Sequence, residues 1–440
     1  MTKNDKKNYR NRMIGEHKLH PETLMMSYGY DPQLSEGAIK PPLFQTSTFA
    51  FKNAEAGKAF FEIQTGKRQL GADESAGLIY SRFNNPNVEI LENRLALWDD
   101  AEDAAVFASG MAAISTIILA FARPGDVVVY SKPIYGGTDT LIQNFFSQLG
   151  IQSVGLTIPC TTEVLQKTLK QAASLGPVAV ILLETPANPT NGLIDIAECR
   201  KLADALDNHG KRPLIAVDNT LLGPLWQHPL KHGADLSLYS LTKYVGGHSD
   251  IVAGSCAGSR VLVSQVRKLR SALGMNSDSH SCWLLMRSLE TLKLRMTAAS
   301  EGARKVAEYL RGHAQVERVH YLGFLEKNDP QYATFQRQCL SPGSTFSFNV
   351  KGGETEAFQL LDSLQIIKLA VSLGGTETLI SHPAAMTHSG IPADVRQAIG
   401  VTPNLLRISV GIENPEDLIA DLEQGLRAMS APSLKKTAAR

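Results

Sequence analysis

Ser240-Leu-Thr-Lys-Tyr-Val-Gly-Gly-His248 is the most informative stretch of the chain, because it places a lysine directly after the apolar run 236–239. Hydroxyl side chains precede Lys243 by one and three residues, and a pair of glycines follows it. A lysine so placed can form a Schiff base with an aldehyde cofactor such as pyridoxal phosphate (PLP), while Ser240 and Thr242 bind the cofactor's phosphate. Taken alone, the stretch is also compatible with a surface lysine that follows a strand.

Apolar runs alternate with helical patterns on both sides of this stretch. The alternation predicts an α/β fold in which helices cover both faces of a mostly parallel sheet. In such sheets ligands bind beyond the carboxyl ends of the strands, where the polar motifs described below stand. The predicted strands are residues 126–130, 178–183, 214–217 and 236–239, and the predicted helices are residues 90–98, 138–149, 162–175 and 197–209.

A second, smaller α/β domain is expected after two consecutive helical patterns, a long helix at 281–296 that continues through 297–313. Near the N-terminus, residues 21–77 have little periodic hydrophobicity, which indicates an irregular extension that wraps over a neighbouring subunit or stays partly mobile. The expected organisation is an N-terminal arm and subunit-contacting extension at 1–77, a PLP-binding domain at 78–285, a C-terminal domain at 286–431 and a disordered tail at 432–440. The C-terminal domain should contain strands 344–350 and 405–410 and helices 354–364 and 417–429.

Composition and charge restrict the class of protein. The chain has 440 residues, of which 43% are hydrophobic, and its 44 basic residues nearly balance its 43 acidic ones, so no global field attracts nucleic acid or an anionic membrane. Residues 104–122 carry no charge, but serine, threonine and glycine interrupt them, which favours a helix buried in the core over a membrane span. No secretory signal is visible, and the five cysteines are dispersed, so we expect reduced thiols in a cytoplasmic protein.

A PLP site also needs a carboxylate and an anion-binding helix start. A carboxylate keeps the pyridine nitrogen protonated, and Asp218 ends the predicted strand 214–217 about one crossover before Lys243. An aspartate that only caps the next turn is the alternative at that position. The phosphate needs backbone N–H groups at the start of a helix, and Ser109-Gly110-Met111 opens the uncharged helical segment.

Two more residues suit such a site. Tyr135 lies in Ile134-Tyr-Gly-Gly-Thr138, where it can stack on the cofactor ring and donate a proton to a leaving group. Arg407, in the strand pattern 405–411, offers a fork-shaped cation for a substrate carboxylate, although an isolated strand arginine is usually a surface residue.

Other motifs are weaker evidence for a binding site. His228 and His232 have the spacing of a helical metal pair, but no third ligand pattern follows and Pro229 intervenes, so no metal site is predicted. The pairs Gly136-Gly137 and Gly246-Gly247 do not form a GxGxxG pattern, so nicotinamide binding is unsupported.

Together, these motifs resemble the Cys/Met-metabolism (trans-sulfuration) family of PLP enzymes, within it the cystathionine γ-synthase and cystathionine γ-lyase branch, close to methionine γ-lyase. The resemblance runs in the family order from about residue 41 to residue 429 and implies PLP fold-type I. The matching segments are Tyr80-Ser-Arg-Phe-Asn-Asn-Pro-Asn87, Ser109-Gly-Met111, Tyr135-Gly-Gly-Thr138, Glu184-Thr-Pro-Ala-Asn-Pro189, Val217-Asp-Asn-Thr220, the lysine stretch 240–248, Ser372-Leu-Gly-Gly-Thr-Glu377 and His382-Pro-Ala-Ala-Met-Thr-His388.

The resemblance implies roles for further residues. Tyr80 and Arg82 would reach the cofactor phosphate of an adjacent subunit, in a homotetramer built from two dimers that share active sites. Asn188 would contact the ring hydroxyl of the cofactor and the substrate, and Ser372 together with Arg407 would hold the substrate α-carboxylate. Glu377 could accept a hydrogen bond from a distal amino group of the substrate, or it could be a structural carboxylate at a turn.

The family chemistry is γ-replacement or γ-elimination on sulfur amino acids or O-acylhomoserine. In it, Lys243 would move the Cα proton and help to remove a Cβ proton, and Tyr135 would protonate the γ-leaving group. Methionine γ-lyases usually carry cysteine two residues after the stacking tyrosine, and Gly137 stands there instead, which favours the cystathionine γ-type enzymes. Methionine γ-lyase remains an alternative, as does a PLP aminotransferase. Residues 64–77 are longer than the usual family loop, which leaves the substrate open.

Overall fold

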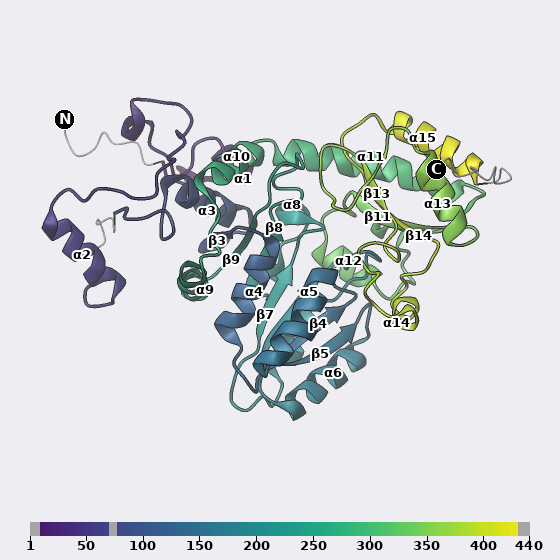
Figure 1. Ribbon diagram of the computed structural model, residues 1–440, viewed down its shortest axis with the longest axis horizontal. Helices are drawn as coiled ribbons and strands as arrows, with labels where there is room; N and C mark the ends of the chain where they lie inside the picture. The colour runs from purple at the N-terminus through teal and green to yellow at the C-terminus, as the bar shows by residue number, and fades with distance from the viewer. Residues whose placement is uncertain (1–8, 70–76, 430–440) are drawn as a thin grey trace, which may run out of the picture.

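The computed structural model describes residues 9–69 and 77–429. Two sheets organise these residues: the larger lies in the lower middle of Figure 1 and the smaller at its right, with the long helix α11 (Leu292–Gly312) running between them. The predicted tail at 432–440, the first eight residues of the arm and residues 70–76 of the long loop lie outside the described residues. The domain boundaries at residues 77 and 285 stay predictions.

The larger sheet is mostly parallel, as predicted. Its strand order is β3-β9-β8-β7-β6-β4-β5, and the pairs from β8 to β5 are parallel, whereas β9 runs antiparallel to both of its neighbours. The four predicted strands are present to within two residues at each end, and β3, β5 and β9 were missed. The strands are β3 (Asp103–Phe107), β4 (Val127–Lys132), β5 (Gln152–Thr157), β6 (Val178–Glu184), β7 (Leu214–Asp218), β8 (Leu236–Ser240) and β9 (Gly254–Gly258).

Helices cover both faces of this sheet, which explains why β6 is continuously apolar from Val178 to Leu183 rather than alternating. One face packs on α4 and α9, and the other packs on α6 and α7 and, toward the β3 edge, on α3 and α10. Between the strands lie α3 (Pro86–Trp98), α4 (Gly110–Phe121), α5 (Gly136–Thr140), η2 (Leu141–Phe146), η3 (Ser147–Leu149), α6 (Thr162–Leu175), α7 (Ile196–Asp204), α8 (Gly223–Trp226), η4 (Pro229–His232), α9 (Arg260–Leu273) and α10 (Ser279–Leu289).

The uncharged segment 104–122 is not one helix. Its first residues form β3, and α4 follows from Gly110 with Ile117 and Ile118 buried in the sheet core. In the part of the chain that the structure describes, no helix combines the length and apolarity needed to cross a bilayer.

The smaller sheet has the order β10-β11-β14-β13-β12 and is antiparallel except for the β12–β13 pair. Its core forms between the sheet and the helices α11, α13 and α15. The predicted elements of this domain are present to within two residues at each end. The elements are β10 (Val316–His320), η5 (Leu322–Phe324), α12 (Tyr332–Gln338), β11 (Thr345–Val350), α13 (Glu354–Ser363), β12 (Lys368–Leu369), β13 (Leu379–Ser381), α14 (Ala393–Ala398), β14 (Leu405–Ser409) and α15 (Pro415–Ala428).

The prediction of a single helix over 281–296 was wrong, because α10 ends at Leu289 and α11 begins at Leu292. The buried guanidinium of Arg295 accompanies the break, since it donates to the carbonyl oxygen of Ser288 near the end of α10 and to those of Tyr244 and Val245. These contacts depend on the tertiary structure and leave no periodic signal. The predicted helix 197–209 also ends early, at Asp204.

The N-terminal extension contains more regular structure than predicted. Its helix α2 projects from the left of the molecule in Figure 1, and Asn53 caps it by accepting a hydrogen bond from the backbone N–H of Ala56 at 2.8 Å. Only a few apolar residues, among them Phe51 and Phe60, pack around this helix, which is why its periodicity was weak. The elements are β1 (Met13–Ile14), β2 (His17–Lys18), α1 (Pro21–Leu24), η1 (Pro32–Ser35) and α2 (Ala54–Gln64).

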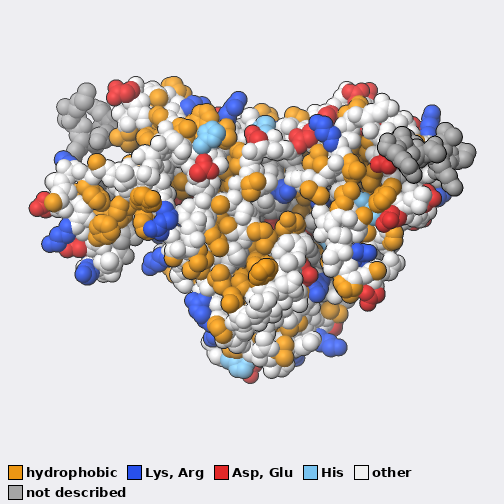
Figure 2. Space-filling model, in the orientation of Figure 1, with side chains coloured by type: hydrophobic (Ala, Val, Ile, Leu, Met, Phe, Trp, Pro, Cys, Tyr) orange, Lys and Arg blue, Asp and Glu red, His pale blue; other side chains and the backbone are white. Residues whose placement is uncertain are grey.

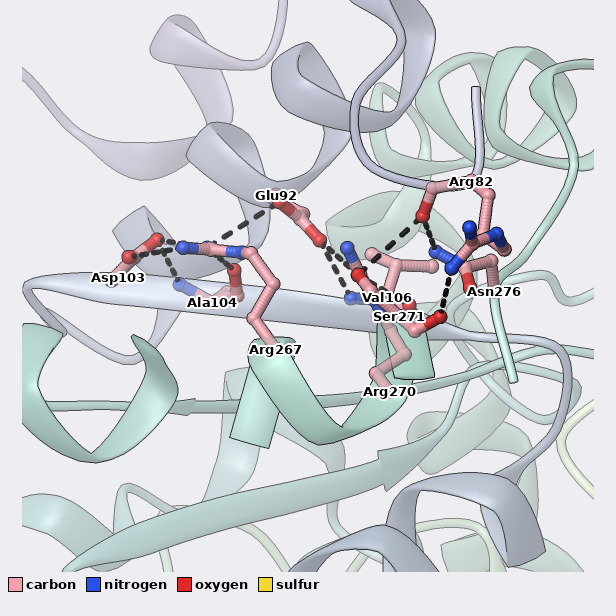
Figure 3. Close-up of polar contacts among 9 residues, drawn as sticks. All are labelled: Arg82, Glu92, Asp103, Ala104, Val106, Arg267, Arg270, Ser271 and Asn276. Atoms are coloured by element: carbon pink, nitrogen blue, oxygen red, sulfur yellow. Dashed lines mark hydrogen bonds and ion pairs between the residues drawn. The ribbon is translucent and has the colours of Figure 1, made fainter. Parts of the chain in front are cut away.

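A buried ionic network ties α3, β3 and α9 together (Figure 3). Glu92 accepts from Arg270 Nη1 at 2.6 Å and from the backbone N–H of Val106 at 3.0 Å, and Arg270 also donates to the carbonyl oxygen of Val106. Nearby, Arg267 makes a bidentate pair with Asp103. Arg270 is 1% exposed, so its charge depends on these acceptors.

Replacing Glu92 by glutamine should lower the free energy of unfolding by about 3 kcal/mol, because it leaves the buried Arg270 cation without its carboxylate. Urea unfolding followed by circular dichroism measures the loss. The exposed pair of Arg304 and Glu308 provides the control, and Glu308→Gln should change stability by less than about 0.5 kcal/mol. Equal effects of the two substitutions would contradict this reading of the network.

Candidate active site

A cavity of about 300 Å³ lies at the carboxyl ends of β6, β7 and β8, against the start of α4. Parallel strands present their carboxyl ends at one edge, so residues that follow different strands meet there. Most of the predicted site residues belong to the wall. The wall consists of Ser109, Gly110, Met111, Ile114, Tyr135, Glu184, Asn188, Asp218, Thr220, Leu221, Ser240, Thr242, Lys243, Val252 and Leu373.

Lys243 follows β8 in a turn that directs its amine into the cavity. Its Nζ donates to Ser372 Oγ at 2.7 Å, across the gap between the two domains. Burial lowers the pKa of Lys243 to about 8, and the cation of Arg407 adds to this effect, while Asp218 opposes it. At pH 7 about a tenth of the amine would therefore be neutral, and so nucleophilic, which is far more than for an ordinary exposed lysine.

Asp218 ends β7 and faces the same cavity. Its Oδ1 accepts from the backbone N–H of Thr220 at 3.1 Å and from the Thr220 hydroxyl at 2.5 Å. Burial raises the pKa of Asp218, although the Thr220 hydrogen bonds and Lys243 act in the opposite direction. A cation beside Asp218 would relieve this cost. Thr220 follows Asp218 by two residues, and the sequence pattern alone does not indicate this hydrogen-bonding role.

The start of α4 approaches the end of β8 closely. Ser109 caps the helix by accepting from the backbone N–H of Ala112 at 3.0 Å. A Cβ on residue 110 would lie 3.1 Å from Ser240 Cβ and 3.2 Å from Ser240 Cα, so glycine keeps the two segments in contact. This helix start, with the Ser240 and Thr242 side chains beside it, is suited to an anion.

Tyr135 lies at the mouth of the cavity with its side chain 46% exposed. A Cβ on residue 137 would come within 2.7 Å of the tyrosine ring, so glycine at this position leaves the ring in its present place. The backbone N–H of Tyr135 donates to Glu184 Oε2 at 2.9 Å.

Arg407 reaches the site from β14 of the smaller sheet. Its Nη1 donates to Asn188 Oδ1 at 3.0 Å and its Nη2 donates to the carbonyl oxygen of Ser372 at 2.7 Å. Within the described part of the chain, its buried Nε has no hydrogen-bond partner. Burial lowers the pKa of Arg407 to about 10. Ser372 has a φ of +100°, a strained backbone for a non-glycine residue that is typical of functional sites.

Glu184 is a wall residue that the sequence analysis did not identify. Its carboxylate accepts from the backbone N–H groups of Tyr135 and Asn188, and the side chain is buried. Burial raises the pKa of Glu184, and the nearby Asp218 contributes in the same direction, while the backbone N–H groups of Asn188 and Tyr135 and the Arg407 cation lower it. An acid directly after the predicted strand 178–183 was a signal that could have found it.

Five predicted residues are not part of the wall of their own chain. Arg407 and Ser372 hydrogen-bond to wall residues, whereas Glu377, Arg82 and Tyr80 lie further away. The carboxylate of Glu377 hydrogen-bonds with the hydroxyl groups of Ser249 and Thr376, which favours the structural alternative for this residue. Arg82 donates to the carbonyl oxygen of Ser271 at 2.6 Å, as Figure 3 shows, and Tyr80 is 42% exposed.

Comparisons with known proteins agree on one family. The family model of the Cys/Met metabolism PLP-dependent enzymes matches residues 22–427. An L-methionine gamma-lyase of Fusobacterium nucleatum subsp. polymorphum is 38% identical over 94% of this chain and 98% of its own length. A cystathionine gamma-lyase of Bacillus subtilis is 36% identical over 92% of this chain and 98% of its own length.

Solved structures give the same result. The crystal structure of cystathionine gamma synthase from Xanthomonas oryzae pv. oryzae, in complex with aminoacrylate and cysteine, superposes with a TM-score of 0.83. The two chains are 32% identical, and the match covers 94% of this chain and 99% of that one.

The residues of the cavity fit the cofactor of this family. The glycine at position 110 lets the start of α4 pack closely against Ser240, so that the helix start and the Ser240 hydroxyl line the same cavity, and the wall also holds an amine and a carboxylate that follow neighbouring strands. These are the groups that the phosphate, the aldehyde and the ring nitrogen of PLP require. The chain therefore belongs to the Cys/Met metabolism PLP-dependent enzyme family, and PLP is its cofactor.

Proposed function

We propose that the enzyme carries out γ-elimination or γ-replacement on L-amino acids with a sulfur or an activated oxygen at the γ-carbon, as cystathionine γ-synthases and γ-lyases do. The contact between Lys243 Nζ and Ser372 Oγ at 2.7 Å carries the proposal. This contact places Lys243, the candidate base, close to Arg407, the candidate partner of the substrate carboxylate. The Cα of a bound amino acid would therefore lie beside the Lys243 amine.

Each part of PLP has a candidate partner in the wall. The backbone at Ser109, Gly110 and Met111, with the Ser240 and Thr242 hydroxyls, would hold the phosphate. Asp218 would hold the ring nitrogen, Tyr135 would stack on the ring and Asn188 would contact the ring hydroxyl. Bound in this way, PLP supplies an electron sink that stabilises negative charge on the substrate carbons.

The protein's own residues would then move the protons. Lys243 Nζ would hold the cofactor aldehyde covalently until a substrate amino group takes its place. As a free amine it would move the Cα proton and, once it has given that proton up, help to remove a proton from Cβ. Arg407 and Ser372 would hold the α-carboxylate and so orient the Cα–H bond toward Lys243. The Tyr135 hydroxyl, at the mouth of the cavity, would protonate the departing γ-group.

Methionine is a second candidate substrate. The cavity wall beside Lys243 contains the apolar side chains of Ile114, Leu221, Val252 and Leu373, which suit an uncharged thioether. Elimination from methionine would release methanethiol, 2-oxobutanoate and ammonia. The hydrogen bond between Ser249 and Glu377 also favours methionine as a substrate. It occupies the Glu377 carboxylate, which was expected to bind the distal amino group of cystathionine.

The proposed assembly is a homotetramer of two dimers that share active sites, in which Tyr80 and Arg82 reach the adjacent subunit's phosphate. The N-terminal extension supports it, since Figure 2 shows hydrophobic side chains gathered there and Phe61 is 54% exposed. The cysteines of the chain are free thiols, which fits the proposed cytoplasmic location.

The reaction is tested by measuring 2-oxo acid release from L-cystathionine, L-methionine, L-homocysteine, and acetyl- and succinyl-homoserine, with and without L-cysteine. Release of 2-oxobutanoate from cystathionine or methionine without an acceptor identifies a γ-lyase, and methanethiol from methionine identifies the second candidate. Cystathionine formed only from an acylhomoserine and cysteine identifies a γ-synthase. Turnover that requires an added 2-oxo acid as amino-group acceptor would indicate an aminotransferase and contradict the proposal.

Lys243→Ala should lower kcat by about 10³-fold or more, because it removes the base for both proton transfers. PLP should still bind, though more weakly, because the phosphate and ring contacts remain. Steady-state kinetics and equilibrium dialysis separate the two effects. A variant with the parent rate would contradict the assignment.

The attachment of PLP to the cofactor-free protein should depend on pH with a midpoint near pH 8, the pKa of Lys243. Only the neutral amine attacks an aldehyde, so the rate should rise about tenfold per pH unit below 8 and level off above it. Stopped-flow absorbance measures the rate, and Lys243→Ala gives the background. A rate that still rises steeply above pH 9 would mean an ordinary exposed lysine.

Tyr135→Phe should lower kcat for elimination about 100-fold while PLP affinity changes little, because the ring remains and only the proton donor is lost. Exchange of the Cα hydrogen in deuterium oxide is the internal control, since it does not require departure of the γ-group. If exchange and elimination fall in parallel, Tyr135 acts before the leaving group departs.

A further inference from the structure

Glu184 joins two segments that reach the active site from different strands. Its Oε2 accepts from the backbone N–H of Tyr135, after β4, and its Oε1 accepts at 2.8 Å from the backbone N–H of Asn188, after β6. Its own backbone N–H donates to Ser131 Oγ of β4 at 2.9 Å. We propose that Glu184 is a positioning residue, which sets the stacking tyrosine and the Asn188 segment relative to one another through a single buried carboxylate. This inference rests on the proposed function of the same cavity.

The two hydrogen bonds explain why an acid stands at this position. The backbone N–H of Asn188 needs an acceptor, because Asn188 is buried and an unsatisfied buried donor is costly, and the same carboxylate also fixes the backbone N–H of the more exposed Tyr135. A carboxylate offers two acceptor oxygens, whereas the amide of glutamine offers one acceptor and one donor. Glutamine would therefore satisfy one segment and oppose the other, although it has the same shape as glutamate.

The effect of Glu184 extends to the second domain through Asn188. The side chain of Asn188 accepts from Arg407 Nη1 at 3.0 Å, and Arg407 in turn donates to the carbonyl oxygen of Ser372, whose hydroxyl contacts Lys243 Nζ. A shift of the Asn188 segment would therefore move the arginine proposed to hold the substrate carboxylate.

The charges around Glu184 show that the position is costly to maintain. Glu184 is buried and pairs in register with the partly buried Asp218 on the adjacent strand, so two acids stand side by side. Burial and Asp218 both raise the pKa of Glu184, while the two backbone N–H groups and Arg407 lower it. An acid kept in such surroundings is more often part of a functional site than of the general core.

The test compares Glu184→Gln with wild-type holoenzyme in three measurements. Visible circular dichroism of bound PLP reports how firmly the ring is oriented, and titration with L-norleucine, which has no γ-leaving group, reports binding of the α-carboxylate. The dichroic band should fall by about half and the affinity for norleucine by about tenfold, while PLP remains bound. The ratio kcat/KM should fall about 30-fold.

Asp421→Asn is the matched control. Asp421 is also a buried carboxylate that accepts backbone N–H groups, those of Gln365, Ile366 and Ile367, but it lies in the C-terminal domain away from the cavity. The control should lower the melting temperature and leave the dichroic band and the norleucine affinity at their wild-type values.

Wild-type dichroism and wild-type norleucine affinity in a folded Glu184→Gln variant would overturn the proposal. If that variant does not fold, Glu184→Asp is measured by the same criteria, because it keeps the charge but is one methylene too short to reach both N–H groups. If the wild-type enzyme shows no γ-chemistry on any substrate but the dichroism and affinity change as expected, the proposed reaction is wrong and the positioning role stands.

Discussion

The parallel pairing of β6, β7 and β8 is the constraint on which the site depends. It aligns Glu184 with Asp218, and Asp218 with Leu238, two residues before the end of β8. The acids and the turn that carries Lys243 therefore meet at one edge of the sheet. A slip of one residue in any of these strands would turn their side chains to the opposite face, where helices pack. The strand interiors pack against helices on both faces, so side-chain packing away from the cavity holds the strands that carry its residues.

A second constraint is the joint between the two domains. The sheet edge provides the amine, and the smaller domain provides Arg407 and Ser372, which meet it through hydrogen bonds. The strained backbone of Ser372, with φ at +100°, is held by these neighbours rather than by its own preference. Catalytic geometry therefore depends on how the domains are held against one another. The hydrogen bond between Arg407 and Asn188 and the packing of α11 both hold them.

Much of the site could be predicted because Asp218 and Lys243 follow recognisable buried strands. The local sequence locates each strand, and the chain direction places the residue that follows it at the carboxyl edge of the sheet. What was missed depends on partners distant in the sequence. Glu184 follows a predicted strand, but its function is visible only when two other segments converge on it. At the break between α10 and α11, Arg295 donates to the carbonyl oxygen of Ser288, a hydrogen bond that forms only when the chain has folded. The helix at 54–64 was missed because few apolar residues pack around it.

The pKa values of the four ionisable groups at the site are all shifted so as to favour the neutral form. Burial raises the pKa values of Glu184 and Asp218 and lowers those of Lys243 and Arg407, so each group is biased toward its neutral form. The protonated ring nitrogen of PLP would stabilise the Asp218 carboxylate, and a substrate carboxylate would stabilise the Arg407 cation. Each ligand would thus strengthen the charge that binds it. Burial stabilises the protonated form of Lys243 less than water stabilises that of an exposed lysine. The same burial therefore keeps the neutral amine available as a nucleophile and a base.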